Sequence, residues 1–239
     1  MNSVAGGGTL VTFPALIFVG LPSIAANATS TVALLPGTLG SAAGYRNNVR
    51  TVRHWLRLFG PVSLLGGLIG GILLVRTPTN VFDALVPFLI LFATILFMAQ
   101  SIFNRFIGVS SESSHARSAA WKPGAIVFQF AVALYGGYFG AGIGILMLAS
   151  LGLLGFENVH EMNTLKVILG FLINVVAAIY FIASGLISWP DAGIMAVGTI
   201  AGGYTGAHVA QRIPQAHVRR VISAIGLIIS AVMFYKRFA

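Results

Sequence analysis

The sequence predicts an all-α, polytopic integral membrane protein built from two repeats of four segments each. Of its 239 residues, 57% are hydrophobic and 8% are charged, whereas a soluble domain carries about 25% charged residues. Long stretches without a charged residue recur along the chain. These stretches do not alternate between apolar and polar residues as the strands of a membrane barrel do, so helices are the remaining way to satisfy the backbone in lipid.

The charge-free stretches are 1–45, 58–75, 84–104, 123–156, 167–190, 192–211 and 221–235. About 20 apolar residues in a helix cross a hydrocarbon core. The first five stretches can each cross at least once, and the first and fourth are long enough for two segments each. The last two are shorter or contain His208. We therefore expect roughly seven or eight membrane segments, some of them half-helices broken by glycine.

Internal similarity divides the chain into repeat 1 (1–105), an inter-repeat loop (106–122) and repeat 2 (123–239). Four matches occur in the same order in both halves: 5–8 with 141–144, 20–29 with 155–164, 42–45 with 177–180, and 66–70 with 202–206. Such order is not expected by chance, so we infer a duplication. Each unit has a glycine-interrupted segment, a helix with polar residues, a helix with a glycine face suited to close packing, and a plain apolar helix.

The first segment of repeat 1 is truncated relative to its counterpart. An apolar half-segment at 123–139 precedes the second glycine cluster, whereas only residues 1–5 precede the first. We expect either that this half-helix was lost or that the native chain starts upstream of Met1.

The basic residues predict the orientation, because short cytoplasmic loops are rich in Lys and Arg. If all eight segments cross, nine basic residues fall on one side and four on the other; if each glycine-broken segment enters and returns on one side, the split is ten against three. The second count favours inverted repeats, a common symmetry of secondary transporters. It places loops 46–57, 105–122 and 211–220 in the cytoplasm. Basic residues confined to loops also argue against a nucleic-acid partner.

Two glycine clusters lie inside apolar segments and are candidate binding elements. Each glycine costs about 1 kcal/mol in a helix interior, so the clusters predict unwinding. Freed N–H groups at the start of the following half-helix would bind an anion. Tight helix packing is the alternative for the second cluster, although the recurrence of the clusters favours function. The candidate glycines are Gly6, Gly7, Gly8, Gly140, Gly142 and Gly144.

The helix after each break carries a polar stripe. In repeat 2, Asn163, Lys166, Gly170 and Asn174 fall within about 80° of one another on a helix, with Thr164 beside them. A lysine inside a membrane segment costs roughly 2.5–3.5 kcal/mol and usually faces a pathway, although snorkelling to the interface is an alternative for Lys166.

In repeat 1, Asn27, Thr31 and Thr38 form the corresponding stripe, with Thr29 and Ser30 beside it. Thr31 aligns with Lys166, so the two stripes together would carry one positive charge. That suits a small anion.

Other polar residues give weaker signals. Gln129 and Tyr135 precede the second break and could line the same cavity, although packed, hydrogen-bonded roles are the stronger interpretation. Glu157 and Glu161 could couple protons but fit solvated helix ends better, and Asp83 and Asp191 suit helix N-caps or interface positions. The chain has no Cys and no paired His or carboxylate spacing, so we expect neither a metal nor a cofactor.

Several of these motifs together resemble the TauE/SafE sulfite exporter family, also called toluene-sulfonate uptake permeases. They are the glycine-rich start at 5–10, Asn27-Ala-Thr-Ser-Thr-Val, Gly44-Tyr-Arg, the run Tyr135-Gly-Gly-Tyr-Phe-Gly-Ala-Gly-Ile-Gly144, Asn163-Thr-Leu-Lys166, Asn174 and Trp189-Pro. The resemblance covers essentially the whole chain. It implies a bacterial inner-membrane secondary transporter that moves sulfite, organosulfonates or related anions, coupled to protons. The short first segment departs from the family pattern.

We therefore expect alternating-access transport of a small sulfur-containing or organic anion, with export as the favoured direction. An anion channel without ion coupling is the alternative. A membrane enzyme is disfavoured, because no nucleophile–base pair or metal set lies in the spans. The expected partners are the small anion and the lipid bilayer. The sequence leaves open whether the protein forms a homodimer.

Overall fold

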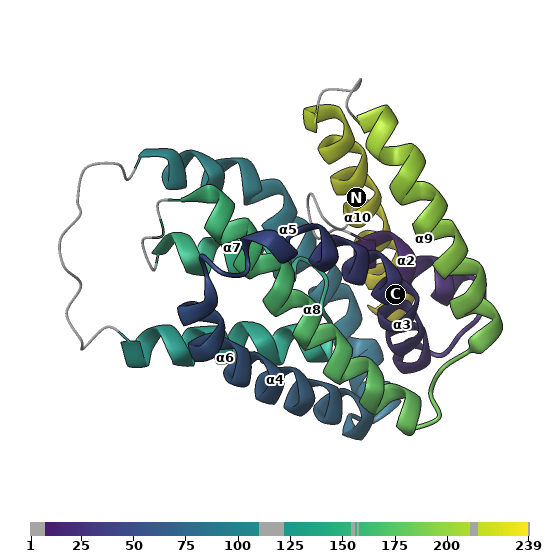
Figure 1. Cartoon of the computed structure of the whole chain (residues 1–239). Helices are drawn as coiled ribbons and strands as arrows, with labels where there is room; N and C mark the ends of the chain where they lie inside the picture. The colour runs from purple at the N-terminus through teal and green to yellow at the C-terminus, as the bar shows by residue number, and fades with distance from the viewer. Residues whose placement is uncertain (1–7, 110–121, 154–155, 157, 211–214, 239) are drawn as a thin grey trace.

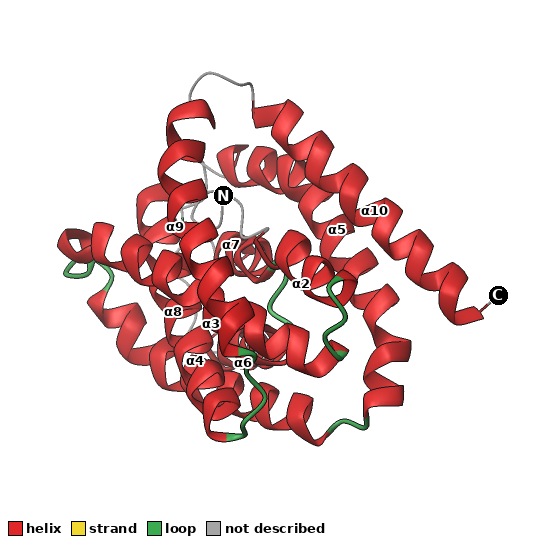
Figure 2. Ribbon diagram, turned by 90° about the vertical axis from the view of Figure 1, so that its right-hand side faces the viewer, coloured by secondary structure: helices red, strands yellow, loops and turns green. Residues whose placement is uncertain are grey.

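The computed structural model describes residues 8–109, 122–153, 156, 158–210 and 215–238 (Figure 1). This part of the chain is entirely helical, as predicted, and Figure 2 shows helices joined only by loops. The elements are α2 (Gly8–Phe18), α3 (Ser23–Gly44), the short 3-10 helix η1 (Arg46–Asn48), α4 (Arg53–Arg76), α5 (Thr79–Val109), α6 (Lys122–Tyr138), α7 (Ile143–Leu153), α8 (Val159–Ala183), α9 (Trp189–Ala210) and α10 (Gln215–Phe238).

Three of the described helices are long and apolar enough to cross a membrane. They are Arg53–Arg76 in α4, Thr79–Ala99 in α5 and His160–Ala183 in α8. Shorter apolar helices lie at Gly8–Phe18, Ile143–Gly152 and Ser223–Tyr235. A multi-pass membrane protein is therefore supported, and the number of seven or eight segments stays a prediction.

The second glycine cluster breaks the chain between α6 and α7, as its glycine content predicted. Gly140 and Gly142 have φ values of +75° and +77°, a region that side chains with a Cβ rarely adopt. The Tyr135 hydroxyl donates a hydrogen bond to the Ala141 carbonyl, 2.7 Å away, and so holds the loop against α6. Of the first cluster, Gly8 opens α2, whereas Gly6 and Gly7 lie outside the described residues.

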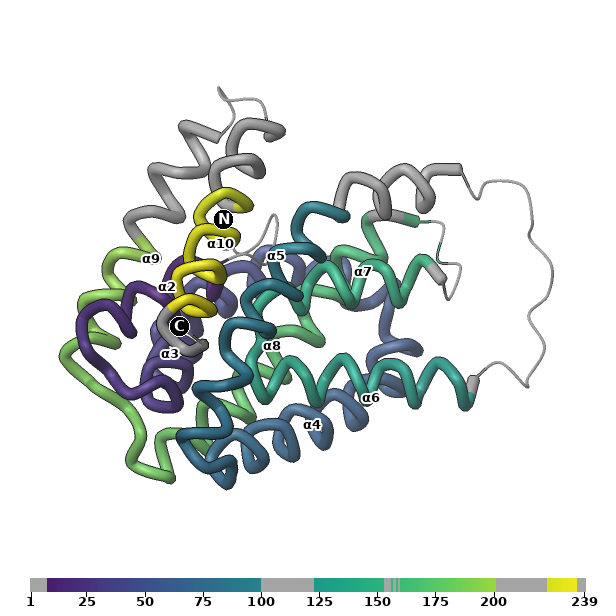
Figure 3. The backbone as a smooth tube through the Cα atoms, turned by 180° about the vertical axis from the view of Figure 1, so that it is seen from behind, coloured from purple at the N-terminus to yellow at the C-terminus, as the bar shows by residue number. Residues whose placement is uncertain are grey.

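Part of the second cluster does not unwind. Gly136 and Gly137 remain helical in α6. Gly137 packs directly against α4, whereas Gly136 packs against Ile143 of α7 and Ile173 of α8. A Cβ at Gly137 would overlap the backbone of Gly67, and one at Gly70 would overlap the backbone of Leu134. Close backbone approach through small residues is the usual way in which membrane helices pack. Figure 3 shows α4 and α6 running side by side.

The helix contacts follow the order of the two predicted units. In that order α3 corresponds to α8, α4 to α9, α5 to α10 and α2 to α7. The contact of α3 with α9 has its counterpart in α8 with α4, and the contact of α2 with α10 has its counterpart in α7 with α5. The contacts α3–α8 and α5–α10 each join a helix to its own counterpart in the other unit. The turns after α2 and α7 also match: Leu21 N–H donates to Leu16 O, and Phe156 N–H donates to Leu151 O, both at 3.1 Å.

Buried aromatic and aliphatic side chains join the helices around the break. Phe13 of α2 lies edge-on to Phe139 in the break, with ring centroids 5.3 Å apart. Phe82 of α5 and Phe181 of α8 belong to the same buried group. A second group, which includes Phe59 and Met147, lies between α4, α6, α7 and α8. Both groups fix the position of the break between α3, α5 and α8.

Candidate functional site

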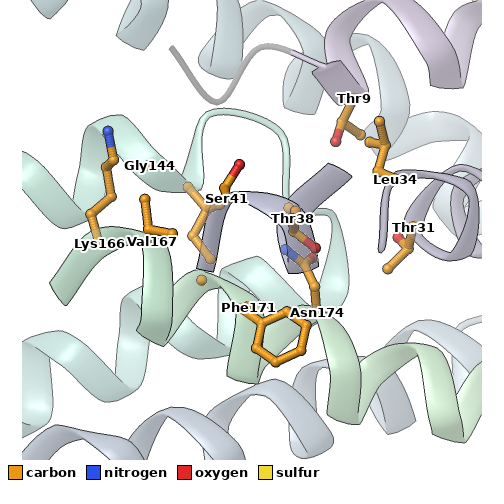
Figure 4. Close-up of a pocket in the computed structure, with 13 residues that line it drawn as sticks. Thr9, Thr31, Leu34, Thr38, Ser41, Gly144, Lys166, Val167, Phe171 and Asn174 are labelled. Carbon is orange, nitrogen blue, oxygen red and sulfur yellow. The ribbon is translucent and has the colours of Figure 1, made fainter. Parts of the chain in front are cut away.

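A cavity of about 70 Å³ lies between α3 and α8 beside the break (Figure 4). It brings together the two polar stripes that the sequence predicted. Its lining residues are Thr9, Thr31, Leu34, Thr38, Ser41, Gly140, Ile143, Gly144, Lys166, Val167, Gly170, Phe171 and Asn174. The site therefore draws on helices from both predicted repeats.

The first turns of two helices border this cavity. Thr9 is the second residue of α2, and Ile143 and Gly144 open α7. The N-terminus of a helix carries a partial positive charge of about half a unit. At the start of α7, the Ile143 and Ile145 N–H groups donate to Gly140 O and Gly142 O at 3.3 and 3.0 Å, so this end contributes mainly through its dipole. Two such ends facing one cavity favour an anion there.

Lys166 is the charged residue of the lining. Its side chain is 8% exposed, and its Nζ donates a hydrogen bond to Asn163 Oδ1 at 2.9 Å. The neighbours on the same face of α8 are Gly170, which leaves open space, and Asn174, whose amide points toward Thr38 of α3 in Figure 4. A buried ammonium without a carboxylate partner attracts an anion.

The α3 wall of the cavity presents hydroxyl groups. Thr31 Oγ1 donates to Asn27 O, Thr38 Oγ1 to Leu35 O and Ser41 Oγ to Gly37 O, each at 2.9 Å. Hydroxyl hydrogens rotate freely, and helical carbonyls also accept backbone N–H groups. These hydroxyls can therefore turn toward a bound anion at small cost.

Five of the candidate site residues line the cavity, and so do two further members of the polar stripes, Thr38 and Gly170. The five are Thr31, Gly140, Gly144, Lys166 and Asn174. Asn163 contributes indirectly, because it holds the Lys166 ammonium. The helical spacing of polar residues in the sequence therefore predicted the central polar residues of the α3 and α8 walls.

The remaining candidates of repeat 1 lie outside the lining. Thr29 Oγ1 accepts a hydrogen bond from Ser188 N–H at 3.1 Å, which ties α3 to the segment before α9. Ser30 Oγ lies 2.7 Å from Thr12 Oγ1 of α2. Asn27 Nδ2 donates to Tyr138 O at the end of α6, 2.9 Å away.

The remaining candidates of repeat 2 also make structural contacts. Gln129 Nε2 donates to Ser63 Oγ of α4 at 2.9 Å, and Thr164 Oγ1 donates to His160 O at 2.7 Å. Tyr135 closes the break, and Gly142 packs against Ala93 of α5. The packed, hydrogen-bonded interpretation of Gln129 and Tyr135 agrees with these contacts.

The sequence did not single out Thr9 or Ser41, and Thr38 entered only as part of a stripe. Ser41 follows Thr38 by three residues, so extending the α3 stripe by one turn would have found it. Thr9 gave no comparable signal, because its position depends on where α2 begins.

The two acidic residues that suggested helix caps bind serine hydroxyls. Asp83 is the fifth residue of α5, not its N-cap, and accepts a hydrogen bond from Ser23 at the start of α3. Asp191 lies in the first turn of α9 and accepts a hydrogen bond from Ser188, three residues earlier. Asp83 therefore lies at the contact between α3 and α5. Glu157 lies outside the described residues, and within the described part no group of three His, Asp or Glu side chains could hold a metal.

Comparisons with known proteins agree with the membrane location of these helices. A family model described as "Sulfite exporter TauE/SafE" matches residues 1–233. A probable membrane transporter protein of Haemophilus influenzae is 28% identical over 242 residues, which cover 99% of this chain and 90% of that relative.

Two further relatives are similar along their length. The probable membrane transporter protein YfcA of Escherichia coli K12 is 24% identical, covering 98% of this chain and 85% of the relative. A probable membrane transporter protein of a Sinorhizobium species is 26% identical, covering 100% and 87%. No solved structure matches the chain. The family model spans almost the whole sequence, so this protein belongs to the TauE/SafE sulfite exporter family of membrane transporters.

Proposed function

We propose that the protein transports a small sulfur-containing or organic anion, of the sulfite or organosulfonate type, by alternating access. The observation that carries this proposal is the position of Lys166, which lines a cavity bordered by the N-termini of α2 and α7. Export across the bacterial inner membrane is the direction we propose, with loops 46–57, 105–122 and 211–220 in the cytoplasm.

The charges around the cavity support an anion as the substrate. Each helix N-terminus stabilises a nearby negative charge by about 0.3–1 kcal/mol, and by up to about 2 kcal/mol in partly buried sites. Lys166 adds a full positive charge, and the described lining includes no carboxylate. The hydroxyls of Thr31, Thr38 and Ser41 and the amide of Asn174 supply further donors. An anion would thus be held by several moderate contacts and could leave again.

The size of the cavity favours a compact anion. A buried water needs about 10–15 Å³ of this kind of volume, so the cavity of about 70 Å³ holds roughly five waters or one small oxyanion. Sulfite suits a cavity of this volume better than the larger aryl sulfonates do. Compact sulfur oxyanions are therefore the substrates we expect to bind most tightly.

The repeat arrangement provides a mechanism for alternation. The matched helix contacts agree with two related units whose polar helices, α3 and α8, meet at the cavity. The distribution of basic residues among the loops favours an inverted arrangement of these units. Rocking one unit against the other would open the cavity to each side in turn. The family resemblance implies a proton as the coupled ion.

Flux measured in proteoliposomes tests this function. Lys166→Met removes the charge and keeps most of the apolar stem, so we expect sulfite flux to fall at least tenfold. Gln129→Met is the matched control, because it removes a buried polar group of the same bundle that contacts Ser63 outside the cavity. Wild-type flux in Lys166→Met, with the protein folded, would reject the site.

An anion channel is the second candidate, since it would use the same polar groups without alternation. A transporter drives one solute uphill with the gradient of another, whereas a channel cannot couple fluxes. Accumulation of labelled sulfite against its gradient, driven by an excess of unlabelled sulfite on the other side, would support the transporter. Flux without such counterflow would support the channel.

A further inference from the structure

The break between α6 and α7 has two helix ends of opposite polarity. The N-terminus of α7 borders the cavity, where its partial positive charge favours an anion. The C-terminus of α6 ends at Tyr138 and carries a partial negative charge. Asn27 of α3 reaches this second end, since its Nδ2 donates to Tyr138 O at 2.9 Å.

The side chain of Asn27 leaves one oxygen unused. Asn27 is 1% exposed, and its Oδ1 has no hydrogen-bond partner among the described residues. Only the amide NH₂ can donate to a carbonyl, so the contact with Tyr138 fixes which atom is the free oxygen. A buried acceptor without a partner is uncommon and costly in folded proteins. Its presence beside a helix C-terminus points to a ligand that oxygen atoms can bind.

Other neutral oxygens belong to a residue one helical turn from Asn27 and to the facing helix α2. Ser30 follows it by three residues and is its neighbour on the surface of α3. Ser30 Oγ lies 2.7 Å from Thr12 Oγ1 of α2, and Thr12 Oγ1 also donates to Gly8 O at 3.0 Å. Within the described contacts of Asn27, Ser30 and Thr12 every partner is a carbonyl or a hydroxyl.

We propose that a monovalent cation binds here, with sodium as the expected ion. Its ligands would be Asn27 Oδ1, the hydroxyls of Ser30 and Thr12 and the carbonyl end of α6. Neutral oxygens do not retain a proton, which favours a metal cation over proton binding. Calcium and magnesium sites usually include carboxylates, whereas neutral oxygens and a helix C-terminus suit a single charge. A dehydrated sodium ion is also smaller than a water molecule, which suits so enclosed an oxygen.

The side chain of Asn27 has no polar counterpart in repeat 2. At the aligned position of repeat 2 stands Met162, which is buried and apolar. The molecule would therefore hold one cation at the end of α6 and one anion at the start of α7, on either side of the same break. Because the cation contacts lie outside the cavity lining, this inference does not require the anion assignment.

The test is thermal unfolding of the purified full-length protein in detergent, without any sulfur anion. Sodium, potassium and choline chlorides are compared at equal ionic strength. We expect a Tm increase that is specific for sodium and saturates with its concentration, as binding to the folded state requires. Equal Tm values in the three salts would overturn the proposal.

Variants locate the ion. Asn27→Leu should abolish the sodium-specific shift and Ser30→Ala should reduce it. The control Ser230→Ala should retain it, because Ser230 is a buried serine that donates to Pro87 O on α5. If Asn27→Leu does not fold, Ser30→Ala against Ser230→Ala decides the location. A full sodium shift in a folded Asn27→Leu or in Ser30→Ala would contradict this location.

The same assay separates the two proposals. Lys166→Met should keep the sodium shift even though it loses sulfite binding, because Lys166 lies in the cavity and makes no described contact with Asn27. A sodium shift lost in Lys166→Met but kept in Asn27→Leu would move the cation to the cavity and reject the site at α6.

Discussion

Lys166 and Thr31 hold aligned positions in the two predicted repeats and line the same cavity. Their positions were predictable, because a polar residue every three or four positions defines one face of a helix. The roles of Gln129 and Tyr135 were ambiguous in the sequence, because a buried polar side chain can form a hydrogen bond within the protein instead of binding a ligand. Sequence spacing does not reveal that Ser63 accepts a hydrogen bond from Gln129 or that the Ala141 carbonyl accepts one from Tyr135.

The hydrogen bond of Tyr135 leads to a prediction about stability. Tyr135→Phe removes the 2.7 Å bond to the Ala141 carbonyl and leaves the break less restrained. A typical intramolecular hydrogen bond contributes about 0.5–1.5 kcal/mol net. We expect a lower Tm in detergent. Tyr235→Phe, at an exposed position in α10, serves as the control, and an unchanged Tm in Tyr135→Phe would show that the bond contributes nothing.

Among the helices, α6 shows what glycine composition predicts and what it leaves undetermined. The glycine run at 136–144 predicted a break, and the helix does end at Tyr138. The limits of the break were not predictable, because Gly136 and Gly137 have the same intrinsic cost as Gly140 and Gly142. Gly137 packs against Gly67 of α4, and Gly136 packs against Ile143 and Ile173. The contacts with Gly67 and Ile173 join residues far apart in the sequence.

Gly137→Ala tests the α4–α6 contact. The added Cβ would overlap the backbone of Gly67, and overpacking of this kind costs about 1–3 kcal/mol. We expect a marked fall in Tm. The matched control is Gly193→Ala in α9, where a Cβ meets open space; there a neutral or slightly stabilising effect is expected. Equal Tm values for the two variants would mean that α4 and α6 do not approach as closely as described.

For the whole molecule, the matched helix contacts agree with a duplication, whereas inverted repeats stay a prediction from the charges of the loops. The chain offers a convenient test of that prediction because it has no cysteine. Single cysteines at the exposed positions Thr51, Thr79 and Ser184 can be labelled in intact cells with a membrane-impermeant reagent. Inverted repeats predict that Thr79→Cys and Ser184→Cys react from outside and Thr51→Cys does not. Protection of Ser184→Cys together with Thr51→Cys would favour eight full crossings.

The proposed transport depends on an anion held at Lys166 beside the start of α7. The most direct measurement is the Tm of the purified protein titrated with sulfite at fixed sodium and ionic strength. We predict a saturable stabilisation of the wild type that Lys166→Met loses, since a ligand stabilises the state to which it binds. A sulfite-dependent shift of equal size in both proteins would contradict the central claim.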